Sequence, residues 1–449
     1  MTATYDLIVL GAGSGGLSVA FRAAHHGARV ALVDPALALG GTCVNRGCVP
    51  KKGLWFAAQL AQAQRLAVEF GFDAKPGALD WAQFRRLRDR YIAGIDQRYA
   101  TRLREKRIDV AHQAGRLMAA DTIELTDGAR LQAAHIVLAT GARPRTLDLP
   151  GFELGLVSDD IFSLDAMPQR LAIVGGGYIA VEFAGMLHAL GADVEVLAVE
   201  RLLKNFDLEM VDALKEKMQA QGIRIDLGSR IKSARRTPRG IALEDAKAGS
   251  RGPYDAVLWA VGRVPNSEKL GLERLGVATD ASGHIQVDAM QNTSVAGVYA
   301  VGDVTQDKAL TPVAVASGRR LADRLFGDRD DAPIDIDAIP SVVFSDPPLG
   351  SVGLSEAQAR KRYGDGVRLY RSHFTPMQFM LAQRKEPSLM KLVCAGEDER
   401  VVGIHLLGPG TDEMLQGFAV ALKLGLRKRD LDTAVAIHPT VAEELLAMG

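Results

Sequence analysis

Alternating stretches of apolar and polar residues open this chain. Residues 5–10, YDLIVL, form an apolar run that predicts a buried strand, and apolar residues at helical spacing follow it. A second apolar run, RVALVD, ends at Asp34 and predicts the next strand. Residues 171–200, LAIVGGGYIAVEFAGMLHALGADVEVLAVE, repeat this order of strand, helix and strand. The pattern predicts an α/β chain built around two similar units.

A glycine-rich turn joins the first strand of each unit to its helix. The first turn reads GAGSGG from Gly11, and the second reads GGGYIA from Gly175. Glycines at this spacing let backbone N–H groups approach a pyrophosphate at the helix N-terminus, where the helix dipole favours an anion. Asp34, about twenty residues further on, is placed to hold the hydroxyl pair of a ribose. We therefore predict two Rossmann-like domains that each bind one dinucleotide.

Three later segments help to assign the two nucleotide sites. The run NTSVAGVYAVGDV, residues 292–304, predicts a strand ending in Gly302-Asp303, where an acid can accept hydrogen bonds from the ribityl hydroxyls of a flavin. HIVLATGARPR (135–145) and WAVGRVPN (259–266) read as the segments that leave the first and the second unit. FAD in the first unit and a nicotinamide nucleotide in the second is the economical assignment.

Composition narrows the class of protein further. The 449 residues include 54 basic and 54 acidic ones, so no net charge argues for nucleic acid or an anionic membrane as a partner. No apolar run reaches the 18 residues of a membrane-spanning helix. The N-terminus enters a strand without a charged leader, and three cysteines are too few for a disulfide framework. These features predict a cytoplasmic protein.

Two of the three cysteines lie close together in GGTCVNRGCVPKK, residues 40–52. No second cysteine pair or nearby histidine completes a zinc site, and a disulfide closing so short a loop would stabilise little. We therefore expect no metal site, and a redox-active Cys43–Cys48 pair fits better. Helix dipoles and Lys51 are expected to lower a thiol pKa there. Cys394, in the apolar run MKLVCAG, is expected to be buried and structural.

Together with the two glycine turns, YAVGDV and the terminal AIHPTVAEELL, this cysteine motif resembles the pyridine nucleotide–disulfide oxidoreductases over essentially the whole chain. Within that family, VPKK after the second cysteine resembles the branch that reduces glutathione disulfide, which includes enzymes for glutathione amide disulfide. The resemblance implies that Cys48 faces the flavin and that Cys43 attacks the substrate disulfide. It also implies a Lys51–Glu182 ion pair beside the flavin and a nicotinamide pocket covered by Tyr178.

His438 is the candidate proton donor to the leaving thiolate. Imidazole titrates near neutrality, and Glu443, five residues on, could orient the ring and stabilise its charge. Because His438 lies near the far end of the chain, the resemblance implies that it reaches the cysteines of a second subunit. The protein is therefore expected to be an obligate homodimer with composite sites.

Glutathione disulfide carries four carboxylates, so cationic and aromatic groups are expected at its site. The resemblance assigns substrate contacts to Ser14, Tyr99, Arg319 and Thr440. Phe21 departs from the family, in which some members carry arginine there for a glycyl carboxylate. An apolar residue at this position would suit a substrate whose carboxylate is blocked, such as an amide. Glutathione disulfide and its amide both stay open.

The choice between NADH and NADPH is also open. Val199 and Glu200 stand where NADPH-linked relatives place arginine, and Glu200 could hold a ribose hydroxyl and repel a phosphate. Arg201 and Lys204 remain possible phosphate partners. Charge favours NADH, whereas family frequency favours NADPH. The residues expected to hold FAD are Gly11, Gly13, Ser14, Gly15, Gly16, Asp34, Thr42, Thr140, Gly141, Asp303 and Thr311. Those expected to hold the nicotinamide nucleotide are Gly175, Gly177, Ala180, Glu200, Arg201, Lys204 and Gly262.

By analogy, an FAD domain covers residues 1–150, with a helical insertion at 53–110, and an NAD(P)H domain covers 151–266. A central segment, 267–337, returns to the FAD domain, and an α+β interface domain with an antiparallel sheet covers 338–449. The leading hypothesis is NAD(P)H-dependent reduction of glutathione disulfide. A lipoamide dehydrogenase is a second enzyme hypothesis. A flavin-based redox sensor without turnover is the non-enzyme alternative, and it predicts a missing cysteine or acid, whereas both are present.

Overall fold

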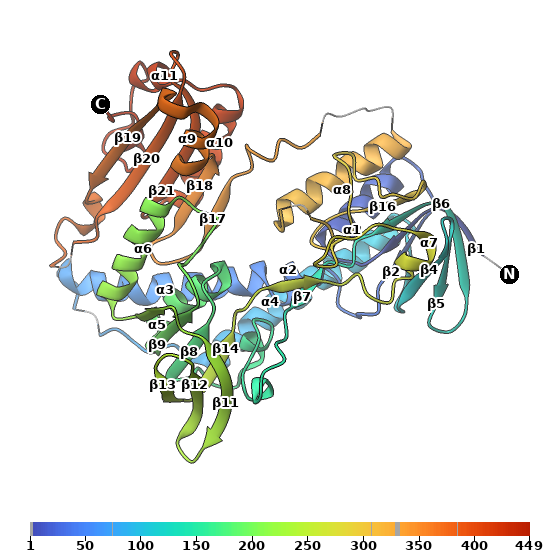
Figure 1. The fold of residues 1–449 in the computed structure, drawn as a ribbon, viewed down its shortest axis with the longest axis horizontal. Helices are drawn as coiled ribbons and strands as arrows, with labels where there is room; N and C mark the ends of the chain where they lie inside the picture. Colours follow the sequence, from blue (N-terminus) through green and yellow to red (C-terminus); the bar gives the residue numbers. More distant parts are fainter. Residues whose placement is uncertain (1–2, 74, 307, 328–332, 384) are drawn as a thin grey trace. The chain divides into compact units, whose positions relative to one another are not determined.

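The computed structural model describes residues 3–73, 75–306, 308–327, 333–383 and 385–449 (Figure 1). The chain divides into two compact units, each assembled from three separate stretches. The first contains residues 1–53, 82–145 and 262–334, and the second contains 54–81, 146–261 and 335–449. The breaks at 145/146, 261/262 and 334/335 fall near predicted domain limits, whereas the second unit contains most of both the predicted NAD(P)H domain and the predicted interface domain. The domains themselves stay a prediction, and residues 307 and 328–332 of the predicted central segment lie outside the described part.

A sheet of parallel strands with an antiparallel extension forms the centre of the first unit. Its strands follow the order β3-β2-β1-β6-β5-β4, and β16 also pairs with β6 but lies outside this order. Strands β1, β2, β3, β6 and β16 run parallel, and β4 and β5 continue the sheet in antiparallel fashion. The strands are β1 (Ala3–Leu10), β2 (Val30–Val33), β3 (Asp109–Ala111), β4 (Gly115–Ala119), β5 (Thr122–Leu125), β6 (Arg130–Leu138) and β16 (Val298–Ala300).

Helices cover one face of this sheet. Apolar residues of α1 (Ser14–His25), α8 (Thr311–Phe326) and α4 (Trp81–Glu105) share one buried cluster with β1 and β2, and α1 and α8 lie side by side (Figure 1). Strands β4 and β5 and the short α7 (Leu272–Leu275) contribute to the cluster on the other face. With both faces covered, β1 reads as a nearly continuous apolar run, as the sequence predicted.

Two short segments at the chain limits of the first unit pair with each other. β7 (Ala142–Pro144) and β15 (Arg263–Pro265) form an antiparallel ribbon within the first unit. Thr140 Oγ1 donates to the Asn266 carbonyl at 2.7 Å, and Asn266 Nδ2 returns a hydrogen bond to the Thr140 carbonyl at 2.9 Å. The segments predicted to leave the two nucleotide units are thus tied together.

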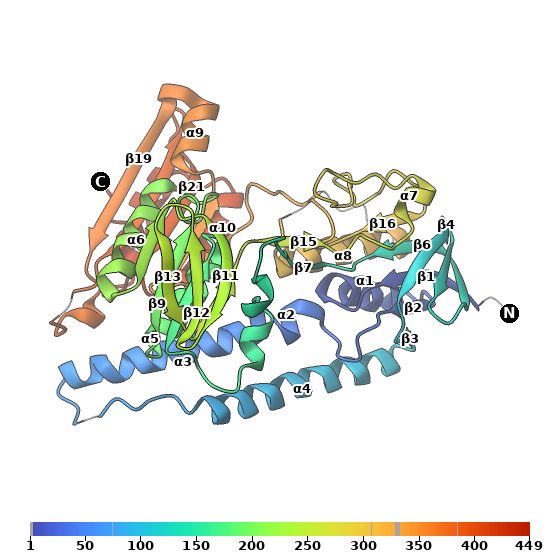
Figure 2. The same ribbon diagram turned by 60° about the horizontal axis from the view of Figure 1, so that its bottom comes forward.

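The second unit contains a four-stranded parallel sheet in the order β10-β9-β8-β14. Strands β11, β12 and β13 form a separate antiparallel sheet whose apolar residues share a core cluster with β8, β9 and β14 (Figure 2). The strands are β8 (Arg170–Val174), β9 (Asp193–Ala198), β10 (Arg224–Leu227), β11 (Ile231–Thr237), β12 (Gly240–Asp245), β13 (Gly249–Tyr254) and β14 (Ala256–Trp259). The helical elements are η1 (Phe152–Leu154), η2 (Asp160–Ser163), α5 (Tyr178–Ala189) and α6 (Leu208–Gln221).

The C-terminal part of the second unit is built on a five-stranded antiparallel sheet, as predicted, in the order β17-β18-β21-β20-β19. Its strands are β17 (Ser341–Val343), β18 (Leu349–Gly353), β19 (Val367–Phe374), β20 (Ser388–Ala395) and β21 (Arg400–Leu407). Its helical elements are α9 (Glu356–Tyr363), η3 (Gly364–Gly366), η4 (Met377–Phe379), α10 (Thr411–Lys423), α11 (Lys428–Asp432) and η5 (Ala442–Leu445). Cys394 is fully buried in β20, as expected for a structural residue, and burial raises the pKa of its thiol to about 12.

Two further helices complete the fold. The short α2 (Gly41–Asn45) carries Cys43, and α3 (Cys48–Glu69) begins at the second cysteine. With α4, helix α3 accounts for the predicted helical insertion. No helix among the described residues is both long and apolar enough to cross a membrane.

Candidate functional site

The two glycine turns are built in the same way. Gly11 has φ +110°, and an added Cβ would lie 2.3 Å from the Ala139 carbonyl oxygen. Gly175 has φ +134°, and its Cβ would lie 2.2 Å from the Ala260 carbonyl oxygen. The first glycine of each turn therefore lies against the backbone just after a neighbouring parallel strand, which is β6 in the first unit and β14 in the second. A side chain at either glycine would disrupt the fold.

The helices that follow both turns have open N-termini. The N-cap residues Gly13 and Gly177 make no side-chain capping hydrogen bond. An added Cβ at Gly177 would meet nothing within 4 Å, so the space in front of α5 is empty of protein. Backbone N–H groups at an uncapped N-terminus are donors for a phosphate. The two turns therefore fit the pyrophosphates of two dinucleotides.

The acids predicted near the first turn are both half-buried. Asp34 accepts hydrogen bonds from the backbone N–H groups of Ala12, at 2.6 Å, and Ala36, at 2.8 Å. Asp303 lies just beyond β16, and burial raises the pKa of its carboxyl group. Within the described part of the chain, no side-chain or backbone donor is recorded for the Asp303 carboxylate. A buried acceptor without a protein donor fits the hydroxyl groups of a bound cofactor.

The cysteine loop packs directly against the first glycine turn. The Gly40 N–H donates to the Ala12 carbonyl at 2.9 Å, and an added Cβ at Gly41 would lie 2.7 Å from the Cα of Gly13. The two glycines that precede Thr42 and Cys43 are therefore needed for this close approach. They hold Cys43 beside the N-terminus of α1.

The two thiols and two hydroxyl groups form one cluster. Cys43 is half-buried and Cys48 is exposed, and their thiols hydrogen-bond each other. The Ser14 hydroxyl, at the start of α1, hydrogen-bonds Cys43, and Cys48 Sγ lies 3.6 Å from Thr311 Oγ1 at the start of α8. Because Cys48 opens α3, three helix N-termini meet around the sulfur pair.

The lowered thiol pKa expected at this pair does not apply to Cys43 in its reduced form. The hydrogen bond with Cys48 and the burial of the sulfur together raise the pKa of Cys43, although Thr311 and Ser14 act in the opposite direction. Two adjacent thiols resist a second negative charge, so only one of them ionises readily.

The residues predicted to surround the flavin and nicotinamide lie in different units. Lys51 follows Cys48 by one turn of α3, in the first unit, whereas Glu182 lies on α5, in the second. Glu182 is only 2% exposed and accepts a hydrogen bond from the Phe344 N–H at 2.9 Å. Their ion pair stays a prediction. Tyr178, the first residue of α5, is 47% exposed at the second glycine turn.

The charged residues after β9 interact with one another. Glu200 and Lys204 form an exposed ion pair at 2.5 Å, which lowers the pKa of Glu200. The Arg201 guanidinium donates to the Lys204 carbonyl. Glu200 is therefore an ionised, paired carboxylate, and its role at the ribose 2′ position stays a prediction.

His438 and Glu443, near the C-terminus, form a hydrogen-bonded pair. His438 Nδ1 lies 2.9 Å from Glu443 Oε2, and this hydrogen bond lowers the pKa of Glu443. The Thr440 N–H donates to the other carboxylate oxygen at 3.1 Å. His438 is 79% exposed, and every residue from 432 to 440 is exposed. The pair is thus ordered but presented outwards.

Among the predicted substrate residues, Tyr99 is half-buried on α4 and Arg319 is exposed on α8. Phe21 is 8% exposed, so its side chain belongs to the core and presents no apolar surface. Tyr99 stacks on the Phe21 ring, and the guanidinium carbon of Arg102 lies 4.3 Å from the ring centre. Arg102 follows Tyr99 by three residues on α4, and this helical spacing is visible in the sequence.

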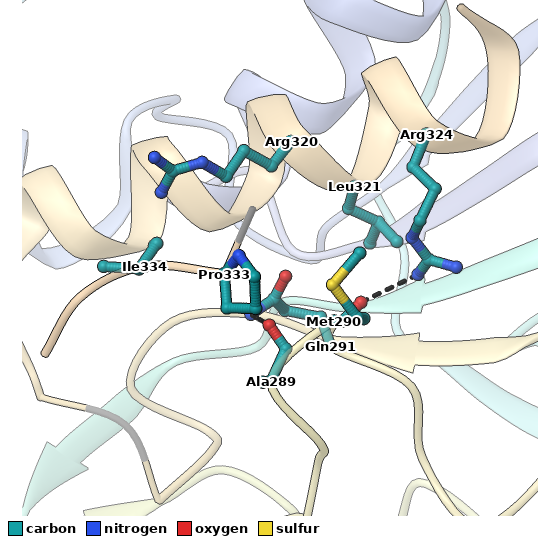
Figure 3. Close-up of a pocket in the computed structure, with 8 residues that line it drawn as sticks. All are labelled: Ala289, Met290, Gln291, Arg320, Leu321, Arg324, Pro333 and Ile334. Atoms are coloured by element: carbon teal, nitrogen blue, oxygen red, sulfur yellow. Dashed lines mark hydrogen bonds between the residues drawn. The ribbon is translucent and has the colours of Figure 1, made fainter. Parts of the chain in front are cut away.

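A small hollow elsewhere in the first unit has a structural role. It lies between residues 289–291 and α8, where Arg324 Nη2 donates to the Met290 carbonyl at 2.7 Å and to Asn292 Oδ1 at 3.0 Å (Figure 3). A free volume of about 10 Å³ holds no more than a water molecule. Its lining residues are Ala289, Met290, Gln291, Arg320, Leu321, Arg324, Pro333 and Ile334.

Two glycine turns that fit dinucleotides, with a thiol pair packed on the first, define a two-nucleotide oxidoreductase of the disulfide-reducing class. A family model described as "Pyridine nucleotide-disulphide oxidoreductase" matches residues 5–318, and the model of its dimerisation domain matches residues 339–448. The chain therefore belongs to the pyridine nucleotide–disulphide oxidoreductases, which confirms the resemblance seen in the sequence.

Curated relatives match the chain over nearly its full length. The glutathione reductase of Yarrowia lipolytica is 40% identical over 464 residues, which cover 99% of this chain and 98% of the relative. The glutathione reductase of Schizosaccharomyces pombe is 41% identical over 458 residues, with the same coverage.

Proposed function

We propose that this protein is a flavin-dependent glutathione-disulfide reductase. The reaction is GSSG + NAD(P)H + H⁺ → 2 GSH + NAD(P)⁺. The observation that carries the proposal is the Cys43–Cys48 pair, packed on a glycine turn that fits a dinucleotide. Full-length similarity to glutathione reductases supports the substrate. The protein is further proposed to act in the cytoplasm.

FAD and a pyridine nucleotide are the cofactors implied by the family. The first glycine turn, Asp34 and Asp303 would hold FAD, which when bound carries electrons from the nicotinamide nucleotide to the disulfide. The second turn would hold the nicotinamide nucleotide, with Tyr178 at its mouth. The chain's own part is to bind both groups, exclude water and place the thiols.

The chemistry at sulfur belongs to Cys43 and His438. The Cys43 thiolate attacks one sulfur of the substrate, which forms a mixed disulfide and releases one thiolate. His438 gives that thiolate a proton. Because Nδ1 is bound to Glu443, Nε2 is the nitrogen that delivers the proton. Cys48 then displaces the second glutathione and restores the Cys43–Cys48 disulfide.

A composite site in a homodimer accounts for the exposure of His438. Val435 is 96% exposed and Ile437 is 78% exposed in the segment that precedes it. Two large apolar side chains beside an ordered histidine–carboxylate pair are typical of a surface that a partner covers. The match to a dimerisation domain supports the same arrangement. We propose that the partner's cysteine pair receives His438.

Turnover of glutathione disulfide with the purified, flavin-loaded protein tests the function. Cys43→Ser should bind flavin normally and lose the reductase activity, because serine cannot form the mixed disulfide. Cys394→Ser is the matched control, since that buried thiol takes no part in the reaction. Disulfide reduction that persists in Cys43→Ser would show that the route through this pair is wrong.

We also propose that Glu200 favours NADH. Its ionised carboxylate can accept a hydrogen bond from the ribose 2′-hydroxyl, and its ion pair with Lys204 competes with the binding of a 2′-phosphate to that lysine. We expect a higher kcat/KM with NADH than with NADPH and a shift towards NADPH in Glu200→Gln. A 100-fold preference of the unmodified protein for NADPH would contradict this role.

A further inference from the structure

Arg102 is an exposed cation with a fixed position and no acidic partner. Its guanidinium carbon lies 4.3 Å from the centre of the Phe21 ring, within the range of a cation–π interaction. Among the residues that the structure describes, no carboxylate forms an ion pair with Arg102. An arginine held on an aromatic face loses little further freedom when an anion binds it.

Phe21 acts as a platform for two substrate-facing candidates. Tyr99 stacks on its ring with centroids 6.3 Å apart and an angle of 24° between the planes. Arg102 follows Tyr99 by three residues on α4, so the two side chains lie on neighbouring positions of one helix surface. Buried Phe21 therefore brings a phenol and a guanidinium together.

The position of Arg102 relative to the thiols follows from α1. The Ser14 hydroxyl hydrogen-bonds Cys43, and Phe21 comes seven residues, or about two turns, later on the same face of the helix. Two turns correspond to about 10 Å along the axis. In the substrate, a cysteinyl residue followed by one more residue spans about 7 Å from its sulfur to the terminal carboxylate. A hydrogen bond of about 3 Å covers the remainder.

We propose that Arg102 binds a terminal carboxylate of the substrate disulfide and that Phe21 and Tyr99 hold its guanidinium in place. The inference deepens the proposed function and depends on it. It also reverses the sequence-based interpretation of Phe21. The apolar ring does not face the substrate, and the cation above it favours a free carboxylate over an amide.

The test compares glutathione disulfide with its diamide, in which both glycyl carboxylates are amidated. In Arg102→Gln, we expect KM and the Kd of the oxidised enzyme for glutathione disulfide to rise about tenfold, with kcat unchanged. A lost charge-assisted hydrogen bond has this size. The diamide should bind unmodified protein and variant alike. Arg102→Lys should recover part of the affinity.

Arg104→Gln is the matched control, because Arg104 is an exposed arginine on the same helix whose guanidinium instead contacts Thr101. It should leave both constants unchanged. Unchanged KM and Kd for glutathione disulfide in Arg102→Gln would overturn the inference, as would an equal loss for the diamide. If unmodified protein does not reduce glutathione disulfide at all, the proposed function fails first, and the two failures are distinguishable.

Discussion

Gly175 and Gly177 stand two residues apart in the second glycine turn, but an added methyl group would meet different obstacles at each. Gly175 combines a positive φ with a contact to the Ala260 carbonyl, whereas Gly177 has φ −81° and open space in front of it. The first glycine is therefore required by the protein itself. The second is required only by a ligand that approaches the backbone.

This difference gives a prediction at the residue scale. Gly175→Ala should lower the free energy of unfolding by about 2 kcal/mol or more, because strained backbone and a clash add. Gly177→Ala should unfold like the unmodified protein but raise KM for the nicotinamide nucleotide about tenfold. Denaturant unfolding and steady-state kinetics measure the two effects. Equal stability loss in both variants would show that the turn is not built for a ligand.

The His438–Glu443 pair gives a second prediction at this scale. His438→Ala should lower kcat by about 10²–10⁴-fold, as expected for a lost general acid, and Glu443→Gln should lower it less. Because the hydrogen bond from His438 lowers the pKa of Glu443, the carboxylate stays ionised above about pH 5. Glu443→Gln should therefore remove a full negative charge from beside His438 throughout the range from about pH 5 to 8, and kcat should be lowered across it. A variant as active as the unmodified protein in that range would contradict this account.

At the scale of elements, an ion cluster connects α6 with the C-terminal sheet inside the second unit. Lys391 of β20 is 1% exposed and pairs with Asp207 at 3.0 Å, Glu209 at 2.8 Å and Glu356 at 2.7 Å. Burial opposes the charge of Lys391, but the three acids raise its pKa. Burial likewise opposes their charges, yet hydrogen bonds and nearby cations lower the pKa of each carboxyl group.

Lys391→Met should therefore destabilise the protein by about 3–5 kcal/mol at neutral pH, because it leaves the buried Asp207 carboxylate without its cation. Glu209 and Glu356 keep their ion pairs with Arg371 and Arg360. The stabilisation from acids with lowered pKa values is present at neutral pH and is lost as pH falls below about 4. The stabilisation from a lysine with a raised pKa is lost only as pH rises above about 10.5. The destabilisation by Lys391→Met should thus shrink towards pH 4.

Urea unfolding at pH 7 and near pH 4 measures this change, with Lys361→Met on the exposed surface of α9 as a control. If Lys361→Met lowers the free energy of unfolding as much as Lys391→Met, the buried cluster does not contribute more to stability than an exposed lysine. The measurement also reports whether α6 and the C-terminal sheet unfold together.

The sequence predicted some elements better than others for physical reasons. The strand–turn–helix units were predictable because apolar runs and glycine spacing are local signals. The start of α3 at Cys48, the β7–β15 ribbon and the contact of Phe21 with Arg102 depend on residues distant in the sequence, so no local pattern reveals them. No local pattern reveals the hydrogen bond between the two thiols either, although it raises the pKa of Cys43.

At the scale of the whole molecule, the proposed active site needs two copies of the chain. Cys43 of one protomer would work with the partner's His438. Loss of one of these residues from a single protomer would therefore impair one of the two active sites and leave the other intact. In the proposed arrangement each active site would draw on both chains, and a closed two-fold dimer would contain two such sites.

Mixing Cys43→Ser and His438→Ala protomers tests this arrangement. After joint unfolding and refolding, or coexpression, about half of the dimers are mixed. Each mixed dimer contains one doubly altered site and one intact site. We therefore expect about a quarter of the unmodified activity, although each variant alone is nearly inactive. If Cys43 and His438 served the same site from one chain, mixing would restore nothing. The measured recovery thus distinguishes a shared site from a protomer that acts alone.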